Sequence, residues 1–185
     1  MYWQSMIIVF SPLIGAIALL FKNKSTDFLS SIIANSAIGV SMLLSLWLFI
    51  SYISGHNVSE SHLIYTWYAT SGYFFEIGLL VDSLTIIMSF IVTFISFFVH
   101  MYSIAYMKGD PSFKRFFIYT NFFTFSMLFI IFSNNFLQLF IGWELVGLSS
   151  YLLIGFWYNK PSAVSANLKA FVVNRVGDIG LLLGV

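Results

Sequence analysis

The sequence lacks cysteine and is poor in charge, and each shortage excludes a class of protein. With no cysteine among 185 residues, the chain can form neither disulfides nor thiolate-bound metal centres. Only 8% of the residues are charged, whereas about 25% is usual in a soluble domain. The formal net charge of +1 gives no basic surface for nucleic acid. Since 59% of the residues are hydrophobic, the composition predicts an integral membrane protein.

Cofactor-binding and catalytic motifs are missing as well. The sequence has no glycine-rich phosphate loop, no G-x-G-x-x-G, no histidine pair suited to haem and no plausible nucleophile–base pair. We therefore expect no bound cofactor and no metal ion in this chain. If the chain belongs to a redox enzyme, the electrons travel through other subunits.

The two ends of the sequence carry different signals. The opening "MYWQSMIIVF" lacks the basic segment of a cleaved signal peptide, so we interpret the first apolar run as a retained span. The final "NRVGDIGLLLGV" stops inside an apolar run. This ending predicts an amino-terminal fragment that is cut within a helix.

Six apolar segments come close to the roughly 20 residues that a membrane-spanning helix needs. Pro111 precedes the fourth segment and Pro161 lies near the start of the sixth, as is common where a helix begins. The sequence therefore predicts an all-α membrane protein. We place the spans at residues 5–21, 29–53, 78–104, 113–132, 136–157 and 164–185, the last one truncated.

The cationic residues fall on one side of these predicted spans. The loops 54–77 and 133–135 contain no Lys or Arg, and the eighth cation, Arg175, lies inside a span. By the positive-inside rule the cationic side faces the cytoplasm or the matrix, which puts the amino terminus outside. The seven cations on this side are Lys22, Lys24, Lys108, Lys114, Arg115, Lys160 and Lys169.

The outer loop 54–77 has a sequence of its own. "IYTWYATSGYFFEI" alternates around Ser71 and Gly72, which predicts a short β-hairpin after the second helix. His56, Glu60 and His62 precede it, and three such groups raise the question of a metal site. Their spacing is irregular, so we interpret them as exposed loop side chains.

Glu144 is the least expected residue of the fifth span, "FIGWELVGLSSYLLIGFW". It lies eight residues past the outer start, about 12 Å deep, close to the middle of a bilayer core about 30 Å thick. An acid at this depth is costly and usually faces the interior of the bundle. Gly147 and Gly155 share its face and allow a neighbouring helix to approach. The sequence favours a proton-exchanging carboxyl, and a structural hydrogen bond is the alternative.

The sixth span contains a second charged group, "NRVGD". Arg175 and Asp178 are three residues apart, share one face of the helix and can pair. They form either a self-contained structural pair or part of a charged axis with Glu144, and the sequence does not separate these readings. Lys169 lies nearer the cationic side, where it either extends outward to the interface or takes up protons for the same axis.

Two polar residues mark the third span. Asp82 lies just inside its outer end, where capping of the helix start is the favoured role. His100 lies near its inner end and serves either as a proton relay or as a hydrogen-bonded packing residue.

The sequence resembles a known family at these same residues. "FSNNFLQLFIGWELVGLSSYLLIGFW" and "KAFVVNRVGD" follow the patterns of the antiporter-like subunit L (mitochondrial subunit 5) of NADH–quinone oxidoreductase, respiratory complex I. "VDSLT" at 81–85 fits as well, and the resemblance extends over the whole chain. Asn134 departs from the Asp that is usual in the family, at a turn position that puts little in doubt.

The resemblance implies a proton-translocating subunit of some fourteen or more helices, of which this chain is the first third. It implies proton-translocation roles for Glu144, Arg175 and Asp178, with a lysine on a seventh helix as the partner of Glu144. NADH, flavin, iron–sulfur clusters and quinone are then expected in other subunits. We expect residues 1–110 to form an amino-terminal membrane region and 111–185 to begin the proton-translocating domain.

The resemblance also implies partners, a location and rival functions. The partners are other complex I subunits, especially a neighbouring antiporter-like subunit, in a bacterial inner membrane or the mitochondrial inner membrane. One rival is a subunit of a multi-subunit monovalent cation/proton antiporter. Another is a structural membrane bundle without transport. As a fragment, the chain is expected to be inactive alone.

Overall fold

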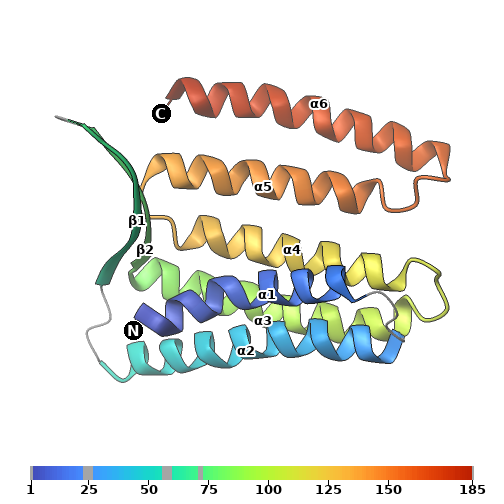
Figure 1. Cartoon of the computed structure of the whole chain (residues 1–185), viewed down its shortest axis with the longest axis horizontal. Coiled ribbons are helices and arrows are strands. Elements are labelled where there is room, and N and C mark those ends of the chain that lie inside the picture. The colour runs from blue at the N-terminus through green and yellow to red at the C-terminus, as the bar shows by residue number, and fades with distance from the viewer. Residues whose placement is uncertain (1, 23–26, 56–59, 71–72, 185) are drawn as a thin grey trace.

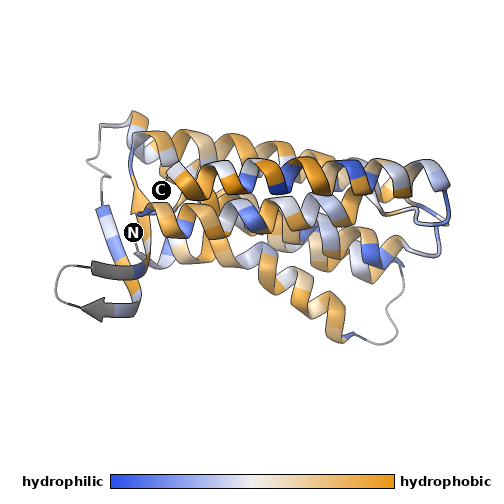
Figure 2. Cartoon of the chain, turned by 90° about the horizontal axis from the view of Figure 1, so that it is seen from above, coloured by the Kyte–Doolittle hydropathy of each residue, from blue (hydrophilic) through white to orange (hydrophobic). Residues whose placement is uncertain are grey.

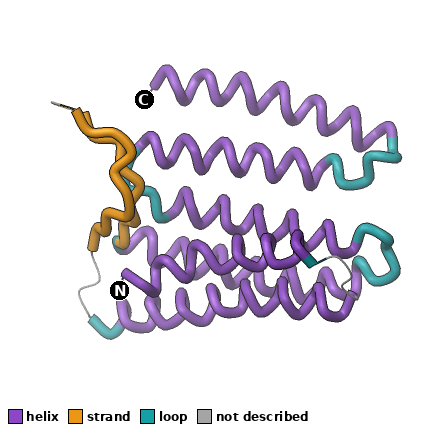
Figure 3. Tube along the Cα trace, in the orientation of Figure 1, coloured by secondary structure: helices purple, strands orange, loops and turns teal. Residues whose placement is uncertain are grey.

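Six helices and one β-hairpin make up the computed structural model, which describes residues 2–22, 27–55, 60–70 and 73–184. The helices run side by side and alternate in direction, and the hairpin lies at the end of the bundle where α1 begins and α6 ends (Figures 1 and 3). The helices are α1 (Tyr2–Phe21), α2 (Asp27–Ile53), α3 (Ser83–Tyr106), α4 (Phe113–Ile131), α5 (Phe136–Ile154) and α6 (Pro161–Gly184), and the strands are β1 (Glu60–Thr70) and β2 (Tyr73–Val81).

The predicted helical membrane architecture is confirmed. Four of the described helices, α1, α2, α3 and α5, are long and apolar enough to cross a membrane. Helices α4 and α6 lie alongside them but contain more charged and amide side chains. Apolar residues cover most of the helix surfaces, whereas polar residues gather at the loops (Figure 2).

Helices α1 to α4 pack around a core, and α5 and α6 are added in turn beside α4 (Figure 1). The core near the hairpin includes Ile8, Leu48, Phe125 and Phe132. Within lipid, burying such side chains gives no hydrophobic driving force, because the lipid tails are equally apolar. Close packing of small residues and hydrogen bonds between helices therefore stabilise the bundle there. At the contact of α1 with α2, the Ser11 and Ser41 hydroxyls lie 2.6 Å apart.

The predicted hairpin is present, with β1 and β2 antiparallel, although residues 71–72 at its tip lie outside the described residues. It is longer than the sequence suggested, and this corrects the start of the third span. Residues 78–81, predicted to be helical, belong to β2, which pairs with β1 and buries Leu79 and Val81 in the core. The strand ends at Val81, and Asp82 then caps α3, which begins at Ser83.

Polar contacts fix the hairpin to the turn between α4 and α5. The Leu80 N–H donates to the Phe132 carbonyl at 3.0 Å, and the Gly78 N–H donates to Gln138 Oε1 at 3.0 Å. Asn135 Nδ2 donates to the Glu76 carbonyl at 2.7 Å, while its Oδ1 accepts from the Gln138 N–H and caps α5. These contacts fix the start of α5 against the hairpin, and they thereby fix the position of Glu144 along the bundle.

Candidate functional site

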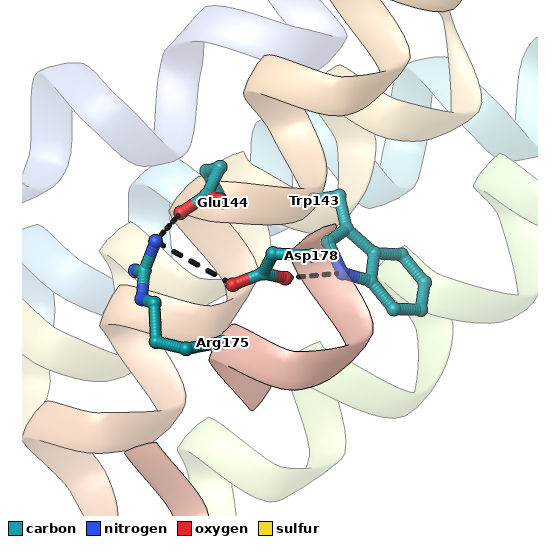
Figure 4. A network of polar contacts seen from close by, with 4 residues as sticks. All are labelled: Trp143, Glu144, Arg175 and Asp178. Atoms are coloured by element: carbon teal, nitrogen blue, oxygen red, sulfur yellow. Dashed lines mark hydrogen bonds and ion pairs between the residues drawn. The ribbon is translucent and has the colours of Figure 1, made fainter. Parts of the chain in front are cut away.

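Four side chains from α5 and α6 form a connected polar cluster at mid-helix (Figure 4). Arg175 Nη1 donates to Glu144 Oε2 at 2.6 Å and lies 3.4 Å from Asp178 Oδ2. The indole N–H of Trp143 donates to Asp178 Oδ1 at 3.0 Å. The predicted Arg175–Asp178 pair thus forms, and Glu144 joins it through the same guanidinium.

The close approach of α5 and α6 depends on glycine, as the sequence predicted. A Cβ atom at Gly147 would contact the Asn174 amide at 3.7 Å. A Cβ atom at Gly155 would collide with the amide nitrogen of Asn167, so a methyl group there requires the Asn167 side chain to move. Across this antiparallel contact, Glu144 lies opposite Arg175.

Burial within the cluster is uneven. The exposed fraction of the side chain is 10% for Asp178, 26% for Glu144 and 44% for Arg175. The Arg175 guanidinium also lies over the ring of Phe171, 5.1 Å from its centroid. This cation–π contact adds to the two carboxylates in holding the cation at mid-helix.

The charges in the cluster do not balance. Two carboxylates share one guanidinium, so the ionised cluster carries one uncompensated negative charge. Asp178 accepts a hydrogen bond from the Trp143 indole and forms an ion pair with Arg175, whereas the only side-chain partner of Glu144 in the described part of the chain is Arg175. Adding one proton would make the cluster neutral, and Glu144 is the carboxylate with fewer side-chain partners.

The structure does not bring the other predicted residues to this cluster. Lys169 is exposed on α6, and no contact between it and Glu144, Arg175 or Asp178 is present in the described residues. His100 is buried in α3, which packs mainly against α2 and α4. The His100 Nδ1 atom lies 2.7 Å from the Ser96 carbonyl oxygen, and its buried Nε2 has no hydrogen-bond partner among the described residues.

The residue at the start of α3 has the predicted capping role. Asp82 Oδ1 accepts from the backbone N–H of Thr85 at 2.7 Å, which satisfies a donor of the first helical turn. Glu60 and His62 form an exposed contact, in which Glu60 Oε2 lies 2.7 Å from His62 Nε2. His56 lies outside the described residues, and the part of the chain that is described contains no group of three potential metal ligands.

Sequence reasoning missed Trp143 and the two asparagines of α6. Trp143 carries an indole N–H into an apolar helix next to Glu144, and an indole N–H within an apolar span needs an acceptor. Asn167 and Asn174 are seven residues apart, which places them on one face of a helix. Both signals were available, but neither identifies the partner without the register of α5 against α6.

Comparisons with known proteins agree on one family. Residues 67–117 match the family described as "NADH-Ubiquinone oxidoreductase (complex I), chain 5 N-terminus". Residues 133–185 match "NADH:quinone oxidoreductase/Mrp antiporter, TM". The first match covers the second half of the hairpin, from residue 67 on, together with α3, and the second covers α5 and α6 with the polar cluster.

Individual relatives extend this agreement over most of the chain. The chain is 47% identical to NADH-quinone oxidoreductase subunit L of Neisseria meningitidis serogroup B, over 97% of this chain and 27% of the relative. It is 45% identical to NADH-ubiquinone oxidoreductase chain 5 of Arabidopsis thaliana, again over 97% of this chain and 27% of the relative. The chain thus spans about a quarter of the length of these relatives.

A solved structure shares the fold. It is the membrane-bound sulfane sulfur reductase, an archaeal respiratory membrane complex, with a TM-score of 0.79 and 18% identity. The match covers 98% of this chain and 36% of the other. The chain belongs to the family of antiporter-like membrane subunits, named subunit L or chain 5, of NADH–quinone oxidoreductases.

Proposed function

We propose that this chain is part of a proton-translocating membrane subunit of NADH–quinone oxidoreductase. Electron transfer from NADH to quinone, on cofactors held by other subunits, drives the proton movement. The observation that carries the proposal is the cluster of two carboxylates that share the single guanidinium of Arg175. In an apolar span such charge is costly, and ionisable residues at this depth usually mark ion or proton pathways.

The geometry supports Glu144 as the group that takes up and releases the proton. When Glu144 is protonated, Arg175 and Asp178 remain as a neutral ion pair. When Glu144 is ionised, it needs the Arg175 guanidinium or a further cation, such as a lysine contributed by a later part of the protein. A change elsewhere in the complex that moves this cation therefore changes the protonation of Glu144. Arg175 and Asp178 set the local field and act as positioning residues.

Further residues are assigned supporting roles in the same proposal. Lys169, exposed nearer the cationic end of α6, is a proton-uptake residue, and His100 is a relay through its unpartnered Nε2 atom. Residues 111–185, which hold the cluster, begin the proton-translocating domain, and residues 1–110 form the amino-terminal membrane region. The neighbouring partner is another antiporter-like subunit of the complex.

The positions of the charges support an orientation. The loop between α3 and α4, which contains Lys108, and the loop between α5 and α6, which contains Lys160, lie at the end of the bundle opposite the hairpin (Figure 1). The positive-inside rule assigns this end to the cytoplasm or matrix and places the amino terminus and the hairpin outside. A bacterial inner membrane or the mitochondrial inner membrane is the proposed location. A protease site inserted after Gly55 should be cut only from the outer side.

The test is Glu144→Gln in the full-length subunit within the assembled, reconstituted complex. The amide keeps the shape but cannot exchange a proton, so we expect fewer protons translocated per NADH oxidised. Glu60→Gln, which changes an exposed acid in β1, is the matched control and should leave this ratio unchanged. A normal ratio in Glu144→Gln would overturn the proposal and favour a structural role for the cluster.

A second function is supported by one comparison. The family matched by residues 133–185 is named for an antiporter as well as for the oxidoreductase. A subunit that exchanges a monovalent cation for protons would use the same carboxylates. Co-purification with flavin and iron–sulfur subunits supports the oxidoreductase, whereas sodium-dependent proton exchange without a redox reaction supports the antiporter.

A further inference from the structure

A pocket of about 180 Å³ lies between α4, α5 and α6 at the cationic end of the bundle. Its lining includes Arg115, Tyr119, Tyr151, Tyr158 and Asn167. One water occupies about 30 Å³ in the liquid, so the volume accommodates a group of several heavy atoms. The proposed function uses none of these side chains.

Arg115 has no acidic partner among the described residues. Its Nη2 atom donates to the Phe156 carbonyl and to Ser112 Oγ, each at 3.1 Å, and its Nε is buried without a hydrogen-bond partner. The guanidinium also lies 5.0 Å from the ring centroid of Phe156 and 5.1 Å from that of Tyr158. These contacts hold the cation in place but do not neutralise it, and a partly buried charge is best satisfied by an opposite one.

The surroundings of Arg115 add positive charge. The first turn of α4 contains Lys114 and no acid, and Lys114 Nζ donates to the Lys22 carbonyl rather than to a carboxylate. The positive end of a helix is normally complemented by negative charge, and Asp110 supplies it here by accepting from the Ser112 N–H at 2.7 Å. The Asp110 carboxylate forms no ion pair with Arg115 in the described residues, so Arg115 itself still lacks an anion.

The pocket also needs a hydrogen-bond donor. Asn167 Oδ1 is buried and has no hydrogen-bond partner in the described part of the chain. Inorganic phosphate, which mainly accepts hydrogen bonds, suits Arg115 better than it suits this oxygen. A glycerol-phosphate group suits both, because it joins phosphate oxygens to hydroxyl donors.

The position of the pocket identifies the source of such a group. It lies at a helix end beside Trp157 and Tyr158, and these residue types collect at the membrane–water interface. Basic pockets between spanning helices at the cytoplasmic or matrix face bind anionic lipid headgroups. We propose that this pocket binds the headgroup of an anionic glycerophospholipid, with its phosphate on Arg115 and a headgroup hydroxyl donating to Asn167. This site goes beyond the proposed function and does not depend on proton movement.

The test uses the full-length subunit in the assembled complex, reconstituted with photoactivatable phosphatidylglycerol. Crosslinked peptides mapped by mass spectrometry should include the α4, α5 and α6 residues that line the pocket. Arg115→Gln should lower this labelling about fivefold or more, as expected for removal of one basic contact. Lys160→Gln is the matched control, because it removes a cation that stacks on Trp157 at the same end of the bundle but does not line the pocket.

Comparison of ligands separates the possible occupants. Asn167→Leu should lower labelling by phosphatidylglycerol but leave labelling by phosphatidic acid, which lacks the headgroup hydroxyl, unchanged. Photoactivatable phosphatidylcholine should label the pocket only at background. If Arg115→Gln does not assemble, the Asn167→Leu comparison decides alone.

Three results would overturn the inference. Equal labelling of Arg115→Gln and the unchanged protein would exclude the phosphate contact. No labelling of the pocket in the unchanged protein would show that another segment or subunit covers it. Loss of labelling on addition of inorganic phosphate at constant ionic strength would identify a free anion as the occupant. None of these readouts depends on proton pumping, so the inference and the proposed function fail separately.

Discussion

Glu144 and Arg175 are 31 residues apart in the sequence, yet their charged atoms lie 2.6 Å apart across the contact of α5 with α6. The contact exists because α5 and α6 are antiparallel neighbours that approach each other where Gly155 faces Asn167. Asp178 shares the same guanidinium, so a change at any member alters the charge balance of the others. Substitutions within the cluster should therefore not act independently.

Removing the shared cation should harm the site more than removing one carboxylate. In Arg175→Gln, Glu144 and Asp178 lose their shared cation, so the contact of α5 with α6 keeps two acids without an opposite charge. We expect proton translocation per NADH to fall, and Arg175→Lys to retain part of it, since it keeps the charge but not the planar fork that reaches both acids. Acidification of reconstituted vesicles measures the ratio. Equal ratios for Arg175→Gln and the unchanged protein would mean that the guanidinium only fixes the helix contact.

The hydrogen bond from the Trp143 indole to Asp178 should stabilise the contact of α5 with α6. Trp143→Phe removes the N–H that donates to Asp178 Oδ1 and keeps most of the apolar surface. A loss of about 1 kcal/mol in the free energy of unfolding is expected for one such hydrogen bond. Proteolytic protection of α5 and α6 in the detergent-solubilised complex measures it.

Trp157→Phe is the matched control for this change. Its N–H donates to Asp110 Oδ2 at 3.3 Å in an exposed position, so the loss should stay within about 0.5 kcal/mol. Equal losses for the two substitutions would show that Trp143 contributes through packing rather than through its hydrogen bond to Asp178.

The helical fold could be predicted from the sequence because lipid restricts the choices. Backbone groups must be satisfied within each segment, so long apolar runs indicate helices, and Pro111 and Pro161 mark where two of them begin. The error at residues 78–81 has the same origin. Gly78, Leu79, Leu80 and Val81 are as apolar as a span, and only pairing with β1 and burial against α1 and α3 make them a strand.

The candidate site could be predicted only in part. Depth and spacing pointed to Glu144, Arg175 and Asp178 and paired the last two. They did not indicate that one guanidinium serves both acids, because that depends on how far α6 is shifted along α5. Trp143 was missed for the same reason, since its acceptor lies on the other helix.

The cap of α3 should be replaceable by another short side chain with an oxygen acceptor. Asp82→Ala removes the acceptor of the Thr85 N–H, with an expected loss of about 0.5–2 kcal/mol, whereas Asp82→Asn keeps an acceptor and should lose little. Hydrogen exchange of the Thr85 amide should therefore be faster in the alanine variant alone. Fast exchange in both variants would mean that the negative charge, rather than the hydrogen bond, holds the start of α3.

Gly147, within α5, and Gly155, at its C-terminal cap, should respond differently to substitution by alanine. A methyl group at Gly155 meets the Asn167 amide, which has to move, so Gly155→Ala should separate α5 from α6 at this point. Overpacking of this kind costs about 1–3 kcal/mol. Gly147→Ala places its methyl in ordinary contact with Asn174 at 3.7 Å and should be tolerated.

The separation of α5 from α6 should be visible at the cluster. A shift of the α5–α6 register lengthens the Glu144–Arg175 contact, so Gly155→Ala should lower both thermal stability and proton translocation, while Gly147→Ala leaves both close to normal. A double variant, Gly155→Ala with Asn167→Ala, removes the amide that the methyl meets and should restore both properties. Failure of this rescue would place the cause in the backbone at the end of α5, where Gly155 forms the helix cap, rather than in the contact between the helices.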